Sequence, residues 1–148
     1  MKILYTIGFT KKSAKEFFEA LRFRSVEVLV DTRINNVSQL AGFTKSDDLK
    51  YFLKAIGNID YIYRPDFAPT KELLKEWRDG NISWEQYEEQ YMSIQEKRGT
   101  YKNFLADFEK YEKICILCSE ATPEHCHRRL LAEKLEKEFP NDIMVIHI

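Results

Sequence analysis

The sequence predicts a single α/β domain spanning residues 1–148, with a mostly parallel sheet of about five strands flanked by helices. Short apolar segments of strand length alternate with longer segments of helical period. Many of the helical segments open on a capping residue. Such alternation builds βαβ units with right-handed crossovers. The expected layering is Rossmann-like, although the chain has no dinucleotide-binding motif.

Five segments are predicted as strands. Residues 26–30 form a continuous apolar and β-branched run, which is typical of a strand buried on both faces. The apolar run at residues 114–118 is short enough to be another buried strand. The full set is residues 2–8, 26–30, 59–63, 114–118 and 142–148.

Helix starts are predicted from capping signals. Ser13 with Glu16, and Ser83 with Gln86, have the spacing of capping boxes. A further helix starts at Thr122, with Pro123 as its first residue. The remaining predicted helices are one that Ser46 caps and Gly57 closes, one from Thr70 to Gly80, and a short one at residues 101–111.

The simplest strand order for this chain, numbered along the sequence, is 3-2-1-4-5. It makes the first and fourth strands neighbours at the topological switch point, where open α/β sheets bind ligands. We expect three segments to meet there with the last helix: the loop after Ile7, residues 31–33 and residues 118–120.

The start of the last helix carries unusual residues. Its inward face is set by Leu130, Leu131, Leu135 and Phe139, and Arg129 is expected to point to solvent. His127 and Arg128 flank the inward face, with Cys126 further round. One interpretation is a core histidine and an arginine in an internal ion pair. The other is an anion site at a helix N-terminus.

Composition narrows the class of protein. The formal net charge of −1 gives no global basic footprint for nucleic acid. No apolar run approaches the roughly 18 residues of a membrane span, and the first apolar segment is too short for a signal peptide. We therefore expect a cytoplasmic protein with no membrane partner. The three cysteines are odd in number, so we expect no disulfide framework.

Acid–base chemistry fits the polar residues near the expected crevice. Asp31, Glu120, Glu124 and His127 are titratable groups, and an imidazole beside a carboxylate can act as general acid or base near neutral pH. Two further side chains, those of Arg33 and Arg128, could clamp a phosphate or carboxylate.

The cysteines allow two other interpretations. Cys118 follows a buried strand and could be a nucleophile, or simply a small buried hydrophobe. Cys115 lies three residues earlier on the opposite strand face, so we expect a structural role for it and no redox pair with Cys118.

Zinc could use Cys118, Cys126 and His127, with Glu120 as a fourth group. The usual paired ligand spacings are absent, so we predict no bound metal. The chain also lacks a P-loop motif, so neither a dinucleotide nor a P-loop cofactor is expected.

Two further segments can be explained without a functional role. Residues 34–45 have no clear period and form either a binding loop or an ordinary surface loop. A stripe of Trp84, Tyr87, Tyr91 and Ile94 at helical spacing is interpreted as packing.

Motifs along nearly the whole chain resemble the family catalogued as domain of unknown function 488. They are Tyr5-Thr-Ile-Gly-Phe-Thr10, Asp31-Thr-Arg33, Ser38-Gln39, Gly42-Phe-Thr-Lys45, Ala68-Pro-Thr70 and Cys118-Ser-Glu120 with Cys126-His-Arg128. The resemblance implies a compact prokaryotic α/β domain without an established activity. It strengthens ten of these residues as site candidates, namely Thr6, Gly8, Asp31, Arg33, Ser38, Cys118, Glu120, Cys126, His127 and Arg128.

The leading hypothesis is an enzyme, a hydrolase or group transferase, that acts on a phosphate-bearing substrate such as a nucleotide or a base in nucleic acid. The alternatives are a non-enzymatic nucleotide or nucleic-acid binding domain, and a thiol-dependent transferase or redox sensor using Cys118. The expected partner is thus an anionic small molecule or a nucleic acid. The predicted catalytic residues are Cys118, Glu120, His127 and Asp31, and the predicted binding residues are Thr6, Gly8, Arg33, Ser38, Cys126 and Arg128.

Overall fold

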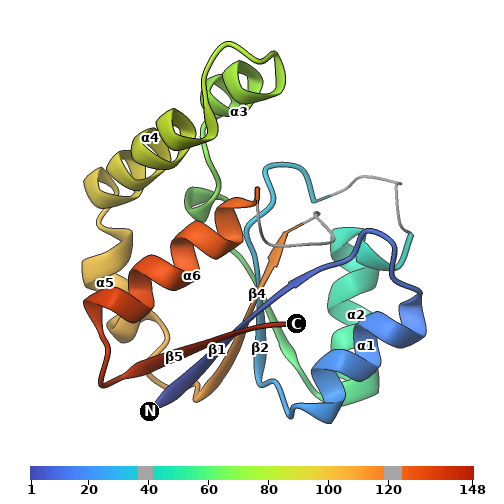
Figure 1. Cartoon of the computed structure of the whole chain (residues 1–148). Coiled ribbons are helices and arrows are strands. Elements are labelled where there is room, and N and C mark those ends of the chain that lie inside the picture. Colours follow the sequence, from blue (N-terminus) through green and yellow to red (C-terminus); the bar gives the residue numbers. More distant parts are fainter. Residues whose placement is uncertain (37–41, 119–124) are drawn as a thin grey trace.

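The computed structural model describes residues 1–36, 42–118 and 125–148. Within them, one five-stranded parallel sheet has helices on both faces (Figure 1), which confirms the predicted fold class. In chain order the elements are β1 (Lys2–Gly8), α1 (Ala14–Phe23), β2 (Val28–Asp31), η1 (Gly42–Thr44), α2 (Ser46–Gly57), β3 (Asp60–Tyr63), η2 (Pro65–Phe67), α3 (Lys71–Arg78), α4 (Trp84–Lys97), α5 (Thr100–Asp107), β4 (Lys113–Cys118), α6 (His127–Glu138) and β5 (Ile143–His147).

The strand order is β3-β2-β4-β1-β5, so the predicted order 3-2-1-4-5 is wrong. β4 separates β1 from β2 and is paired with both. Its residues from Ile114 to Cys118 are all buried, and a strand so apolar gains most from a central position. The simpler order would have left β4 one place further from β2.

The first and fourth strands are neighbours, as predicted. The helix that follows β1 and the helix that follows β4 lie on opposite faces of the sheet (Figure 1). α1 and α2 cover one face with the core around Phe17, Leu29 and Leu53. α5 and α6 cover the other with the core around Val30, Phe104 and Leu131, and α4 packs on these two helices. Because the helices that follow these two neighbouring strands lie on opposite faces, the topological switch point falls between β1 and β4.

Several helix boundaries follow the predicted caps. Ser13 and Ser83 both form complete capping boxes, and Thr70 caps α3. α2 differs, because Lys45 is its N-cap residue and Asn58 rather than Gly57 adopts the left-handed conformation after it. Asparagine tolerates that conformation because its short polar side chain can hydrogen-bond locally.

The last helix begins later than predicted. α6 starts at His127, and Cys126 before it has an extended backbone, with φ −133° and ψ 138°. A helix starting at Pro123 and running through Cys126 is therefore wrong, while Thr122 and Pro123 themselves lie outside the described residues. Leu130, Leu131 and Leu135 are buried as predicted, whereas Arg129 is partly covered by Glu88 and Glu133.

Candidate functional site

A cavity of about 650 Å³ opens at the carboxyl ends of the strands, between the start of α6 and the α3–α4 pair. Its volume is in the range of small-molecule sites. The residues around it are Phe9, Arg33, Ile34, Asn35, Pro69, Lys71, Leu74, Lys75, Trp77, Arg78, Asp79, Tyr87, Cys118, His125, Cys126 and His127.

The strand ends meet beside this cavity as the sequence predicts. Gly8 at the end of β1 is paired with Cys118 at the end of β4. Asp31 at the end of β2 is paired with Leu117. Parallel strands place their carboxyl ends at one edge of the sheet, so segments far apart in sequence gather there.

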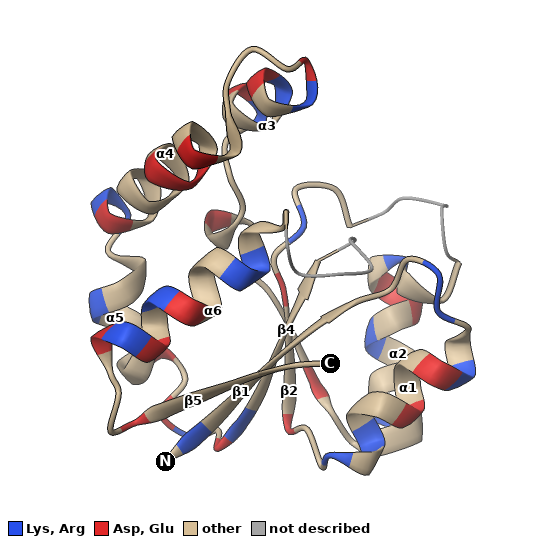
Figure 2. Ribbon diagram, in the orientation of Figure 1, with Lys and Arg blue, Asp and Glu red and all other residues tan. Residues whose placement is uncertain are grey.

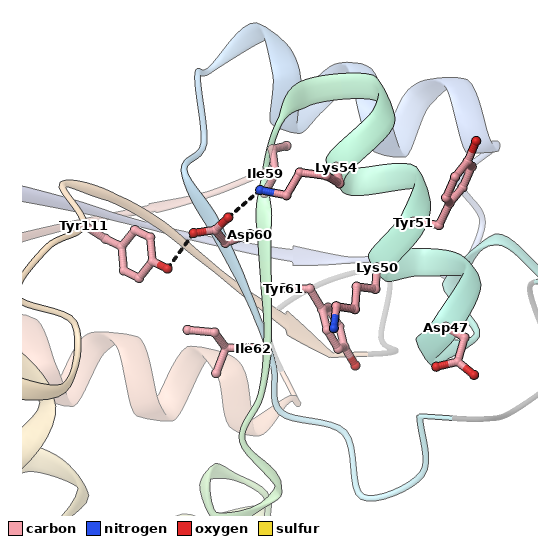
Figure 3. Close-up of a pocket in the computed structure, with 9 residues that line it drawn as sticks. All are labelled: Asp47, Lys50, Tyr51, Lys54, Ile59, Asp60, Tyr61, Ile62 and Tyr111. Carbon is pink, nitrogen blue, oxygen red and sulfur yellow. Dashed lines mark hydrogen bonds and ion pairs between the residues drawn. The ribbon is translucent and has the colours of Figure 1, made fainter.

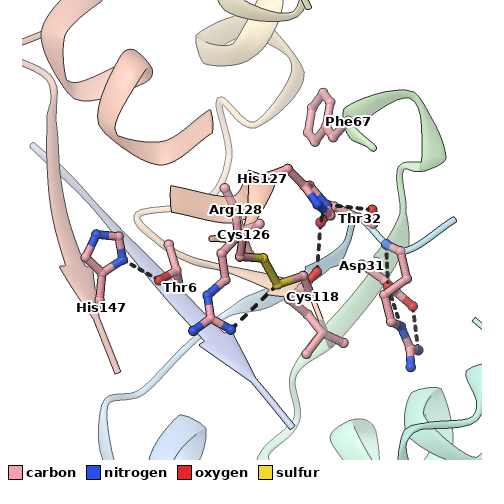
Figure 4. Close-up of a disulfide and its surroundings, with 12 residues drawn as sticks. Thr6, Asp31, Thr32, Phe67, Cys118, Cys126, His127, Arg128 and His147 are labelled. Carbon is pink, nitrogen blue, oxygen red and sulfur yellow. Dashed lines mark hydrogen bonds and ion pairs between the residues drawn. A yellow bond between two sulfur atoms is a disulfide. The ribbon is translucent and has the colours of Figure 1, made fainter. Parts of the chain in front are cut away.

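His127 is held at the cavity by Thr32, the residue after β2 (Figure 4). Its Nε2 lies 2.9 Å from Thr32 Oγ1 and 3.1 Å from the Thr32 carbonyl oxygen. The Thr32 hydroxyl donates its proton to the Leu117 carbonyl at 2.8 Å, so this oxygen accepts from His127. Both contacts place the proton on Nε2. Nδ1 is then the unprotonated nitrogen of the ring.

The imidazole of His127 is neutral at pH 7. Burial lowers its pKa to about 4, and the nearby Arg128 guanidinium acts in the same direction. The Thr32 carbonyl and Asp31 oppose this shift without reversing it. A neutral ring with a fixed tautomer can accept a proton at Nδ1.

Asp31 and Arg33 form a buried bidentate pair. Arg33 Nε and Nη2 donate to the two carboxylate oxygens at 2.9 and 2.8 Å. Asp31 Oδ2 also accepts from the Tyr61 hydroxyl at 2.7 Å, and Arg33 Nη2 donates to the Thr44 carbonyl at 2.6 Å. Asp31 is fully buried and does not line the cavity, whereas Arg33 does. This arrangement fixes the loop after β2 to η1.

Cys118 and Cys126 are joined in a disulfide (Figure 4), so the expectation of no disulfide is wrong. The odd number of cysteines is accounted for by Cys115, which is free and fully buried in mid-β4. The pairing follows from tertiary structure, because the start of α6 packs against the end of β4. Burial also raises the pKa of the Cys115 thiol, as befits a structural residue.

Arg128 is fully buried, as its place on the inward side of α6 predicts. Its Nη1 lies 3.7 Å from Cys118 Sγ. Arg128 does not line the cavity, so the structure separates it from Arg33.

Thr6 also lies away from the cavity. Its hydroxyl is 2.5 Å from His147 Nδ1, and His147 Nε2 is 3.3 Å from Glu133. Thr6 is fully buried between β4 and β5. It therefore joins β1 to the end of β5 and the middle of α6.

Three predicted polar residues, Ser38, Glu120 and Glu124, lie outside the described residues. Among the described residues, no group of three or more His, Cys, Asp or Glu side chains could hold a metal ion. Since the possible ligand Glu120 is not described, the absence of a bound metal stays a prediction.

An aromatic wall of the cavity was not predicted from the sequence. Trp77, Tyr87 and His125 line it, and Trp84 packs on the latter two. The stripe containing Trp84 and Tyr87 was the available signal, and packing explains only part of it. The loop from residue 34 contributes Ile34 and Asn35 to the cavity lining, and its role as a binding loop stays a prediction.

A second cavity, of about 550 Å³, lies beside the edge strand β3 (Figure 3). Three of its polar side chains bond to one another. Asp60 accepts from Lys54 at 2.6 Å and from Tyr111 at 2.7 Å. This second cavity lies toward the amino end of β3 and shares no lining residue with the first cavity, so we do not assign it to the functional site.

The parallel sheet and the cavity at its switch point define an α/β protein with a strand-end pocket. Residues 13–135 match the family model described as "Domain of unknown function DUF488", and the chain belongs to that family. Comparison with curated proteins and with solved structures found no match. In the described part of the chain, no helix has the length and apolar character needed to cross a membrane.

Proposed function

We propose that the protein is a hydrolase or group transferase that acts on a phosphate-bearing substrate, such as a nucleotide or a base in nucleic acid, in the strand-end cavity. The observation that carries the proposal is the neutral His127, whose Nε2 is fixed by Thr32 and whose ring lines the cavity. Sites with a perturbed titratable group in a concave pocket are favoured positions for catalysis.

Positive groups around the cavity support a phosphate-bearing substrate. Lys71, Lys75 and Arg78 lie on one side of α3 and line the cavity with Arg33. Spacings of three and four residues bring them together on one helix face. A phosphate would reach several cations without a need for a net basic protein.

In hydrolysis, His127 Nδ1 removes a proton from water as the water oxygen bonds to the electrophilic atom of the substrate. The bond to the leaving oxygen breaks with its electron pair, and the leaving oxygen takes the proton back from the imidazolium. Group transfer follows the same course with an alcohol in place of water. General acid–base assistance of this kind contributes about 10²–10⁴-fold.

The proposal is tested by turnover of a panel of phosphate esters and nucleotides, together with thermal unfolding in their presence. A bound substrate raises the unfolding temperature by mass action. We expect His127→Gln to keep this stabilisation and to lose about 10²-fold or more in kcat. Lys71→Ala with Arg78→Ala should weaken the stabilisation, and Lys50→Ala at the second cavity is the matched control.

Two results would contradict the proposal. Stabilisation without turnover by any member of the panel would favour the non-enzymatic binding domain. Equal kcat in the wild-type protein and His127→Gln would remove His127 from the reaction.

A thiol-dependent function is the second candidate, favoured by the Cys118–Cys126 disulfide at the cavity. A dithiol reductant supplies two electrons and two protons and releases both thiols. Arg128 would then lie beside Cys118, where a cation favours the thiolate.

Alkylation followed by mass measurement tests this candidate. The denatured oxidised protein should incorporate one alkyl group, at Cys115, and the reduced protein three. A chain that incorporates three groups after incubation with a peroxide oxidant would exclude a reversible pair. Unchanged activity of Cys118→Ser would exclude Cys118 as nucleophile.

A further inference from the structure

We propose that the aromatic wall of the cavity, formed by Trp77, Tyr87 and His125, is a base-stacking subsite and that its occupant is a free nucleotide. The inference rests on the proposed function, since it divides the same cavity into a base side and a phosphate side. It adds the substrate class, which the acid–base site alone leaves open.

The rings around Trp77 contact it at steep angles and not as parallel stacks. Trp84 and Tyr87 are stacked on each other, with centroids 4.7 Å apart and an interplanar angle of 15°. Trp77 meets Trp84, Tyr87 and His125 at 61°, 50° and 69°. Among the described rings, none is stacked parallel to Trp77. Trp77 also lines the cavity, where a ligand can reach it. A heteroaromatic base has the flat surface needed to stack there.

The phosphate side lies on the same helix. Lys71, Lys75 and Arg78 are exposed on α3 and line the cavity together with Trp77. Lys75 already contacts Asp79 at 2.5 Å, so Lys71 and Arg78 are the principal phosphate partners. One short helix thus presents a stacking ring and positive charges, the two chemical groups that a nucleotide needs.

The surroundings favour a free nucleotide over a nucleic-acid strand. α4, which packs on α3, carries Glu85 and Glu89 in its first half (Figure 2). A strand leaving the cavity past this helix would bring its phosphates close to these carboxylates. Strand-binding proteins instead use a continuous basic groove. The net charge of −1 agrees with this choice.

Calorimetry with matched probes tests the inference on the whole chain: adenosine monophosphate, adenosine, ribose 5-phosphate and a single-stranded oligonucleotide. The monophosphate should bind tightest. Trp77→Leu should weaken its binding by about fivefold or more, since base–aromatic stacking is worth roughly 1–3 kcal/mol. Trp77→Phe should restore most of the loss, and ribose 5-phosphate should bind both variants like the wild type.

Fluorescence supplies an independent readout, because both tryptophans of the chain are in or against this wall. The monophosphate should quench the emission of the wild-type protein and of Trp84→Phe, whereas ribose 5-phosphate should not. Circular dichroism of Trp77→Leu verifies that the variant is folded. If it is not, the wild-type comparison of the four probes decides the question.

The outcomes separate the two proposals. Ribose 5-phosphate binding as tightly as the monophosphate would overturn the stacking subsite and leave the proposed function intact. Adenosine binding as tightly as the monophosphate would keep the subsite and contradict a phosphate-bearing substrate. Tighter binding of the oligonucleotide would overturn the free nucleotide, and failure of all four probes to bind would overturn the inference.

Discussion

At the scale of single residues, Asp31 is an anchor of the loop that leaves β2. Its carboxylate accepts two hydrogen bonds from the Arg33 side chain and one from Tyr61, and both members of the ion pair are buried. Breaking such a pair by removal of one partner is costly, because the other charge stays buried.

Asp31→Ala should therefore lower the free energy of unfolding by about 3–5 kcal/mol. Tyr61→Phe removes one hydrogen bond to the same carboxylate and should cost roughly 1 kcal/mol. Urea denaturation measures both. An equal loss of unfolding free energy in the two variants would contradict the view that the unpaired buried Arg33 charge causes most of the loss in Asp31→Ala.

His127 makes stability depend on pH. Its pKa of about 4 in the folded protein is below the ordinary value near 6.5, so the unfolded chain binds more protons between these pH values. The stabilisation is complete above pH 6.5 and is lost as pH falls toward 4.

His127→Gln should therefore lose less stability than the wild type between pH 7 and pH 4, by about 1–3 kcal/mol. Glutamine keeps an N–H donor for Thr32, and His125→Gln changes an exposed histidine as the control. Denaturation at a series of pH values measures the difference. Parallel pH curves for wild type and His127→Gln would show that His127 is not the titrating group.

At the scale of elements, the α3–α4 pair decides the shape of the cavity. Tyr91 of α4 donates to the Phe67 carbonyl at 2.7 Å, and Gln95 donates to the Ala68 carbonyl. These contacts fix α4 to the segment that leads into α3. Ser83 begins α4 by accepting from Gln86 while Gln86 bonds back to its backbone.

Ser83→Ala should destabilise the protein by about 1 kcal/mol, as loss of a helix cap does. It should also weaken ligand binding, because α4 supports the aromatic wall. Ser13→Ala removes the equivalent box from α1 on the opposite face of the sheet, with a similar loss of stability and no effect on binding. Denaturation and calorimetry together distinguish the two variants. An equal effect of both on binding would contradict a local role of α4.

At the scale of the whole molecule, the sheet and the α3–α4 pair differ in how they are supported. β4 and β1 are paired with strands on both sides and covered on both faces. α3 packs mainly against α4, and its exposed side faces solvent (Figure 1). Regions with few buried contacts open locally at a lower free energy.

Native-state hydrogen exchange should therefore show the slowest amides in β1 and β4 and faster exchange in α3. Amides of α3 should exchange more slowly when the cavity is occupied, because the ligand must dissociate before α3 opens. Equal protection of α3 and β4 in the unliganded protein would contradict this order.

The sequence by itself determined the α/β class, the extent of most elements and the meeting of strand ends beside His127. These features depend on local pattern and on the common direction of parallel strands, both of which a sequence carries. Tertiary structure alone decided the central place of β4, the Cys118–Cys126 bridge, the separation of Arg128 from Arg33 and the aromatic wall. Each depends on which elements pack together, because a buried strand, a cysteine or a tryptophan stripe has the same local pattern whichever partner it meets.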